Sequence, residues 1–177
     1  MTDEARLLVA ARKLESRALA EIHDRFYPDL YRYLVYRTGD GHTADDLSSE
    51  VFMRLLEALQ NGKGPDVLRP WLFGVAGHLV ADHFRRAARR PQVELSEDLS
   101  SLDGDPAREA GLSLRTRAVR LALQQLTDEQ QQVLALRFEQ GRSVADTAEL
   151  LNKSVTAVKQ LQFRAVAALR RQLGEWQ

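Results

Sequence analysis

The sequence of 177 residues contains no cysteine, which excludes disulfides, thiolate catalysis and cysteine-ligated zinc within this chain. It also lacks any run of eighteen apolar residues, so no segment is typical of a membrane span. Residues 1–20 carry charges throughout, and we expect no secretory signal there. These absences favour a cytoplasmic protein that makes no membrane contact of its own.

A nucleotide-hydrolysis site is missing as well. The Gly-Lys-Gly run at 62–64 is far shorter than the G-x-x-x-x-G-K-[ST] loop that cradles phosphates. His78, Asp82 and His83 resemble a metal-binding cluster, but residues spaced as the two histidines are lie about 140° apart around a helix. We therefore expect no catalytic residue, no cofactor and no metal.

Net charge is absent too, because 25 Lys and Arg balance 25 Asp and Glu. The charges are unevenly placed, however. Residues 61–90 carry 6 basic and 2 acidic groups, and residues 130–177 carry 7 and 4. Two basic surfaces, one in each half, suit two contacts on one polyanion, although a chance mosaic of solvated charge would give the same counts.

What the chain does contain is apolar residues at helical spacing, with a hydrophobic content of 44% that supports packed cores. We predict an all-α protein with two small helical domains, residues 1–90 and 113–177, each with its own core. The segment 91–112 is rich in Ser, Asp, Glu, Pro and Gly and has no helical period. That composition predicts a flexible, acidic linker.

Several local signals place the helices of these domains. A helix at 4–20 should be followed by a fresh helix or a kink at Pro28, because proline cannot donate a backbone hydrogen bond. Thr43 should cap an acidic helix whose outward residues include Asp46 and Glu50. A basic protein partner or plain solvation would both explain that acidic face. The tyrosine-rich stretch 27–36 fits either a buried core or a base-stacking platform.

The stretch 142–171 predicts a helix-turn-helix. Ser143 and Ser154 are suitable N-caps, and Asn152-Lys153 can form the turn between the helices. One face of the second helix is polar with basic edges, which suits a DNA major groove, although two ordinary core helices would share the pattern. The residues expected to contact DNA are Lys153, Thr156, Lys159, Gln160, Phe163 and Arg164. Phe163 would contact thymine methyls or pack beneath a neighbouring helix.

A further helix should begin near Pro70, which fits a first helical turn, and end near Arg90. Its outer face should carry small residues, among them Gly74, Gly77 and Ala81, and its end is rich in arginine for phosphate contacts. In the second domain, Thr127 with Gln130 three residues later forms a capping-box pattern that should begin a scaffold helix.

Taken together, these motifs resemble bacterial sigma factors of the extracytoplasmic-function (ECF) group, which retain only regions 2 and 4. Residues 45–54 look like region 2.2, and residues 69–86 look like regions 2.3 and 2.4. Residues 126–138 with 154–165 look like region 4. The resemblance covers nearly the whole chain outside the linker and the extreme ends.

The resemblance implies a sigma factor that binds core RNA polymerase and promoter DNA. Its acidic helix would dock on the β′ clamp helices through Asp46, Ser49 and Glu50. Region 4 would contact the β flap and read the minus-thirty-five element. Region 2 would recognise and open the minus-ten element through Trp71, Gly74, His78, Asp82, Arg85, Arg86 and Arg89. An anti-sigma factor is a further expected partner.

The sequence departs from the family pattern at three places. Ser49 stands where the family often has Gln, Gly77-His78 where Arg-Asn is common, and Leu161–Phe163 where Arg-Leu-His is commoner. Base preferences therefore do not follow from the resemblance. The alternative hypothesis is a stand-alone helix-turn-helix repressor with an N-terminal ligand or dimerisation domain. A nuclease is disfavoured, because neither basic block has a carboxylate cluster with metal-ligand spacing beside it.

Overall fold

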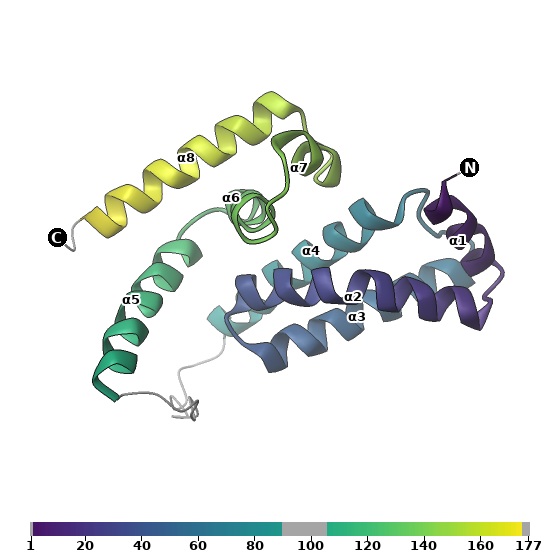
Figure 1. Cartoon of the computed structure of the whole chain (residues 1–177), viewed down its shortest axis with the longest axis horizontal. Helices are drawn as coiled ribbons and strands as arrows, with labels where there is room; N and C mark the ends of the chain where they lie inside the picture. Colours follow the sequence, from purple (N-terminus) through teal and green to yellow (C-terminus); the bar gives the residue numbers. More distant parts are fainter. Residues whose placement is uncertain (1, 90–105, 175–177) are drawn as a thin grey trace.

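The structure is a computed structural model that describes residues 2–89 and 106–174, with side chains in the second part from Leu114 onward. All regular secondary structure in these ranges is helical, which confirms the predicted fold class (Figure 1). The first domain contains α1 (Asp3–Arg12), α2 (Ser16–Thr38), α3 (Gly41–Gln60) and α4 (Leu68–Arg89). The second contains α5 (Pro106–Gln124), α6 (Asp128–Leu134), the π-helical turn η1 (Ala135–Glu139), α7 (Val144–Leu150) and α8 (Val155–Leu173).

The first domain is built on α2, which packs against α3 and α4. Its apolar stripe recurs every four residues, and Ile22, Phe26, Leu30 and Leu34 are all buried. Facing side chains from α3 and α4 complete the core. Each fully buried side chain of this size contributes about 1.5–3 kcal/mol through removal from water. None of the described helices is long and apolar enough to cross a bilayer.

The structure contradicts one expectation for the start of the chain, and one of the two alternatives for Pro28. The helix expected at 4–20 is broken at Leu14, which adopts a left-handed φ of 60° between α1 and α2. Pro28 starts no fresh helix, since α2 runs through it from Ser16 to Thr38. The buried stripe lies on both sides of Pro28, and packing of that stripe offsets the roughly 3 kcal/mol that an internal proline costs.

The cap of α3 also differs from the prediction. Asp40, not Thr43, is the N-cap, and its carboxylate accepts a hydrogen bond from the Thr43 backbone N–H at 2.8 Å. Gly39 ends α2 with a left-handed φ of 74°, which turns the chain within one residue. Pro70 lies in the first turn of α4, as predicted.

The second domain begins earlier than expected but otherwise follows its local signals. Its first helix starts at Pro106, inside the segment assigned to the linker, and residues 90–105 lie outside the described part. The side chain of Thr127 accepts from the Gln130 backbone, and the Gln130 side chain accepts from the Thr127 backbone. Ser143 caps α7, Ser154 caps α8, and Asn152 turns with a φ of 52°. The helix-turn-helix is confirmed.

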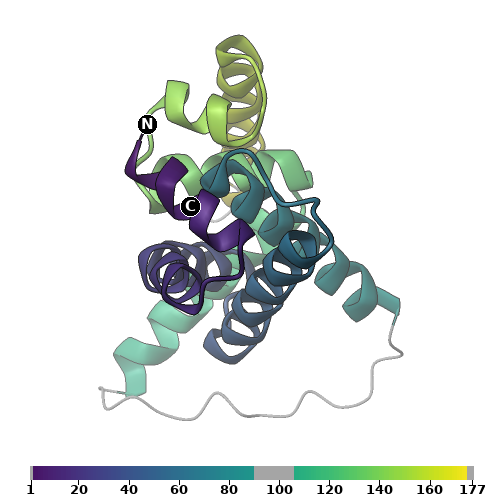
Figure 2. The ribbon, with the colours of Figure 1, turned by 90° about the vertical axis from the view of Figure 1, so that its right-hand side faces the viewer.

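The two domains pack against each other. Helix α2 contacts η1, and α4 contacts both α6 and α7 (Figures 1 and 2). Ala135, Leu136 and Leu150 of the second domain join the buried cluster of the first. The two cores are therefore continuous at this interface, while Val133 of α6, Ala148 of α7 and Val158 of α8 form a smaller cluster.

Candidate nucleic-acid and protein interfaces

Helix α8 has two faces of opposite character. Val158 and Ala165 are fully buried, and they hold the helix against α6 and α7. On the opposite face the predicted DNA-contacting side chains Thr156, Lys159, Gln160, Phe163 and Arg164 are all exposed. The Ser154 side chain accepts from the Ala157 backbone N–H at 3.1 Å, which fixes the start of this face. The sixth candidate, Lys153, is half-buried, and its ammonium lies 2.5 Å from a Glu129 carboxylate oxygen.

Phe163 does not pack beneath a neighbouring helix, since it is 77% exposed. It borders a shallow groove whose other apolar walls are Val144, Val166 and Ala167, with Lys159 and two arginines at the rim. Val155, in the first turn of α8, is also exposed. An apolar groove edged by cations can receive the methyl-bearing edge of a base and the adjacent phosphates, and thymine contact stays a prediction.

Helix α4 presents a second basic surface at its C-terminal end. Arg85, Arg86 and Arg89 are exposed there, and Arg90 lies outside the described residues. Asp82 accepts a hydrogen bond from Arg85, and that bond lowers the pKa of Asp82 below its usual range. This pairing ties the Arg85 guanidinium to its own helix, and the side chain remains 58% exposed.

Nearer the start of α4, the remaining candidates are less exposed. Trp71 and Gly74 are half-buried, and His78 is exposed. A Cβ at Gly74 would meet no atom within 4 Å, so close approach of a partner backbone is open there. Across the described residues, no three His, Cys, Asp or Glu side chains are grouped to hold a metal ion.

The helical period predicts an outer face for Gly77 and Ala81, but the structure does not place them on one. Both are buried. A Cβ at Gly77 would overlap Nε2 of Gln132 on α6, with the Tyr33 hydroxyl 3.6 Å away. The second domain covers this side of α4. Helical periodicity separates the faces of a helix but does not tell which of them a distant segment will cover.

The acidic face of α3 points outward as predicted. Asp46, Ser49 and Glu50 are exposed, and Glu50 pairs with Arg54 one turn on, at 3.0 Å. Asp46 and Glu50 also line a groove between α3 and α4, opposite Arg86. The Glu50 side chain is still 48% exposed in this pair, so the face remains able to receive a basic partner.

The tyrosine-rich stretch of α2 belongs mainly to the fold. Tyr33 is fully buried, while Tyr27, Tyr31 and Tyr36 are half-buried. The Tyr27 hydroxyl donates to Asp45 at 2.5 Å, and this hydrogen bond, with burial, raises the pKa of Tyr27 to about 12. Tyr27 therefore links α2 to the first turn of α3.

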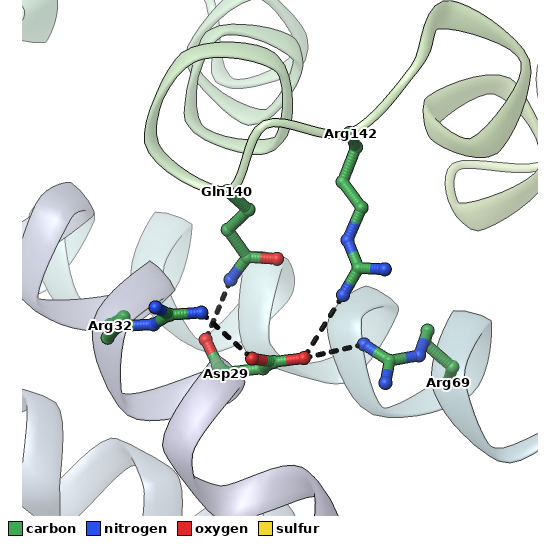
Figure 3. Close-up of polar contacts among 5 residues, drawn as sticks. All are labelled: Asp29, Arg32, Arg69, Gln140 and Arg142. Atoms are coloured by element: carbon green, nitrogen blue, oxygen red, sulfur yellow. Dashed lines mark hydrogen bonds and ion pairs between the residues drawn. The ribbon is translucent and has the colours of Figure 1, made fainter.

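A polar cluster that no sequence pattern indicated is centred on Asp29 (Figure 3). Its carboxylate pairs with Arg32 at 3.0 Å, with Arg69 at 2.9 Å and with Arg142 at 3.0 Å. Its backbone carbonyl accepts from Gln140 Nε2 at 2.7 Å. Burial alone would raise the pKa of Asp29, but the hydrogen bond and charge of Arg69, with the charges of Arg142 and Arg32, hold that pKa below its usual value. No local pattern relates Asp29 to Arg69, Gln140 and Arg142, which are distant from it in sequence.

Comparison with known proteins matches both domains. The family model for region 2 of the sigma-70 factors matches residues 22–90, and the model for region 4 matches residues 122–171. The ECF RNA polymerase sigma factor BldN of Streptomyces coelicolor is 36% identical over 179 aligned residues, which cover 97% of this chain and 67% of that protein.

Two solved structures share the arrangement of helices. CnrH in complex with the cytosolic domain of CnrY covers 97% of both chains with a TM-score of 0.67 and 23% identity. RpoE in complex with the anti-sigma factor NepR from Bartonella quintana covers 88% of this chain and 96% of that chain, with a TM-score of 0.56 and 18% identity. At these identities the likeness establishes the fold alone.

Proposed function

Because the chain belongs to the ECF group of bacterial RNA polymerase sigma factors, we propose how its two domains divide the work of starting transcription. A sigma factor binds core RNA polymerase, recognises the minus-ten and minus-thirty-five promoter elements and enables promoter opening. The matches to both sigma regions favour this function over a stand-alone repressor. We further propose that the chain has no catalytic activity of its own and acts in the cytoplasm with the polymerase.

Recognition of the minus-thirty-five element is assigned to α8. The observation that carries this assignment is the exposure of Thr156, Lys159 and Gln160 on one face of a capped helix whose other face is buried. A helix of this kind fits the major groove, and Gln and Lys side chains can reach base edges there. Lys153 and Arg164 flank the face and are assigned to phosphates.

Recognition of the minus-ten element is assigned to α4. Arg85, Arg86 and Arg89 would contact phosphates, and Trp71 would stack on an unpaired base. Extruding a base costs a few kcal/mol, which such contacts can offset without nucleotide hydrolysis. Two weak contacts with one DNA molecule then reinforce each other, because the second contact forms at high effective concentration.

Attachment to the polymerase is assigned to the acidic face of α3. Asp46, Ser49 and Glu50 would contact a basic surface of the β′ clamp helices. Region 4 would contact the β flap, and one or both surfaces would be covered by an anti-sigma factor when the chain is held inactive. The similarity to a sigma factor solved with its anti-sigma factor supports that last proposal.

Two sets of substitutions test this division. Lys159→Ala with Gln160→Ala should weaken binding to the upstream element while core polymerase binding survives. Asp46→Lys with Glu50→Lys should abolish polymerase binding and leave upstream-element contact intact. Pull-down with core polymerase and gel shift with promoter DNA measure the two functions separately. Loss of the same function in both sets would contradict the assignment.

A further inference from the structure

We propose that a small cavity at the C-terminal end of α2 binds a free inorganic oxyanion of the phosphate type, held by Arg37 with Arg120 at the mouth. This inference goes beyond the proposed function, because none of the residues assigned to DNA or to the polymerase lines the cavity. Binding of the oxyanion can be measured with the full chain alone, without polymerase or promoter.

The cavity lies where α5 passes the end of α2, and its volume is about 20 Å³. A bound water needs about 10–15 Å³ of such space, so the cavity admits one or two atoms of the size of an oxygen. Its charged walls are Arg37 of α2 and Arg120 of α5, and none of the described residues that line it is Asp or Glu. Arg120 and Gln124 are exposed, so the mouth is open to solvent. The cavity is therefore electropositive and accessible to a small anion.

Arg37 is a buried charge whose hydrogen bonds are incomplete. Only 6% of the residue is exposed, and its Nη1 donates to the Tyr33 hydroxyl at 2.7 Å. Its Nε and Nη2 have no hydrogen-bond partner within the described part of the chain. A buried cation that meets only a neutral hydroxyl is costly, because the protein interior stabilises charge less than water does. An anion in the cavity would supply both the missing acceptors and the missing opposite charge.

The two free nitrogens of Arg37 define the shape of the missing ligand. Nε and Nη2 lie on one edge of the planar guanidinium, and this edge presents two nearly parallel N–H bonds. Such a fork matches two oxygens of one oxyanion better than a single halide ion. A planar carboxylate would use both of its oxygens on Arg37, whereas a tetrahedral oxyanion keeps further oxygens for donors on α5. The arrangement therefore favours an ion of the phosphate type.

Arg120 contributes the second positive charge. Its guanidinium lies against Gly39, where an added Cβ would be 2.7 Å from Cζ and 2.9 Å from Nε and Nη1. Carbonyl groups at the C-terminal end of α2 attract a cation, and this attraction accounts for the position of Arg120 without any ligand. It does not account for the free edge of Arg37. The proposal therefore depends on Arg37, and Arg120 adds charge at the mouth.

Water and a DNA phosphodiester are the competing occupants of the cavity. Water can accept from Nε and Nη2 of Arg37, but it leaves the buried positive charge without a counter-ion. A phosphodiester carries the charge, but sugars block two of its oxygens and a cavity of about 20 Å³ leaves little room for them. These occupants differ in their dependence on added phosphate, so solution measurements distinguish them.

Isothermal titration calorimetry of the full chain tests the ligand. Inorganic phosphate is titrated at constant ionic strength, and chloride, acetate and dimethyl phosphate are titrated in the same way. The proposal predicts one site for phosphate, with binding of the other three ions weaker by about tenfold or more.

Each other outcome of this titration would overturn the proposal. Absence of phosphate binding would mean that water fills the cavity. Chloride that binds as tightly as phosphate would indicate attraction of any negative charge. Acetate that binds as tightly would indicate a carboxylate site, and dimethyl phosphate that does so would indicate a contact with the DNA backbone.

Two substitutions test the residues, each with a matched control. Arg37→Lys keeps the charge but removes the fork, and Arg120→Gln removes the charge at the exposed mouth. Each should weaken phosphate binding about tenfold. Arg25→Lys makes the first exchange at an exposed position of α2, and Arg117→Gln makes the second on the exposed side of α5. Both controls should bind phosphate as the parent does, and equal losses in the controls would overturn the site.

A spectroscopic measurement separates this cavity from phosphate binding elsewhere on the chain. In nuclear magnetic resonance spectra of the arginine side chains, the Nε–H signal that disappears in Arg37→Lys belongs to Arg37. That signal should shift when phosphate is added and stay unchanged with chloride. Circular dichroism should show that the variants keep their helices, and Arg120→Gln decides the question if Arg37→Lys does not fold. A parent that binds phosphate with no Nε–H signal responding, or with full affinity in Arg120→Gln, would overturn the proposal.

Discussion

Arg142 Nη2 lies 3.0 Å from the carboxylate of Asp29, a residue 113 positions earlier in the chain. This ion pair joins the start of the helix-turn-helix to the central helix of the other domain. It also makes the packing of the two domains depend on pH, because Asp29 and the neighbouring Glu139 have pKa values shifted in opposite directions.

The pH dependence of the contact between the two domains follows from the directions of these two pKa shifts. Burial and the charge of Asp29 raise the pKa of Glu139 above its ordinary 4.5, against the opposing charge of Arg32. The contact between the two domains therefore takes up a proton and tightens as pH falls from neutral toward that value. The lowered pKa of Asp29 contributes stability above its ordinary 3.8, and this is lost as pH falls through the lower, folded value. With spin labels at Glu57→Cys on α3 and Ala145→Cys on α7, the distance between the labels should be most uniformly short between the ordinary pKa values of the two groups, 3.8 and 4.5. Glu139→Gln should remove the tightening, and a parent distribution that does not change with pH would contradict this account.

The capping box of α6 should contribute measurably to stability. In Thr127→Ala the Gln130 backbone N–H loses its acceptor, and the free energy of unfolding should fall by about 1 kcal/mol. Urea denaturation followed by circular dichroism measures this change. Thr116→Ala on the exposed side of α5 is the control and should stay within about 0.5 kcal/mol of the parent. A loss at Thr116 equal to that at Thr127 would mean that the cap has no special role.

Phe163 should act through DNA and not through the fold. Since its side chain is 77% exposed, Phe163→Ala should leave the unfolding free energy within about 0.5 kcal/mol of the parent. If it contacts a thymine methyl, replacing thymines of the upstream element by deoxyuridine should weaken binding of the parent in gel shifts. The same replacement should have no effect on Phe163→Ala. Equal sensitivity of both proteins to deoxyuridine would exclude the methyl contact.

Trp71 should matter for opening more than for attachment. Trp71→Ala removes a ring that can stack on an unpaired base, which is worth about 1–3 kcal/mol. Open complexes on duplex promoters, detected by permanganate footprinting, should become several-fold rarer. A promoter with an unpaired minus-ten region should recover most of the lost open complex, and core polymerase affinity should be unchanged. Full loss on the unpaired template would instead place Trp71 in the folding of region 2.

Local features of this fold could be predicted from the sequence because their causes are local. Ser143, Ser154 and Thr127 each cap the helix that follows them, since a side-chain oxygen satisfies a backbone N–H three residues away. The division of α8 into a buried and a polar face follows in the same way from its period. The break at Leu14 could not be predicted, because leucine is not a residue that usually adopts a left-handed backbone conformation.

Long-range features could not be predicted in this way. The pairing of Asp29 with Arg142, and the covering of Gly77 by Gln132, depend on how two separately predicted domains pack. A glycine in a helix is consistent with either an open outer face or a socket, and only the position of α6 distinguishes them. The assignments of Asp46, Ser49 and Glu50 to the polymerase remain predictions for the same reason, because the partner that would cover them is another protein.

Run-off transcription with purified core polymerase tests the central claim most directly. Templates should carry genomic promoters, and start sites should be mapped by sequencing the transcripts. The account predicts transcripts that begin at defined sites downstream of two spaced elements, only when this chain is added, and that disappear with Asp46→Lys and Glu50→Lys. A core polymerase that neither binds the chain nor starts transcripts in its presence would contradict it.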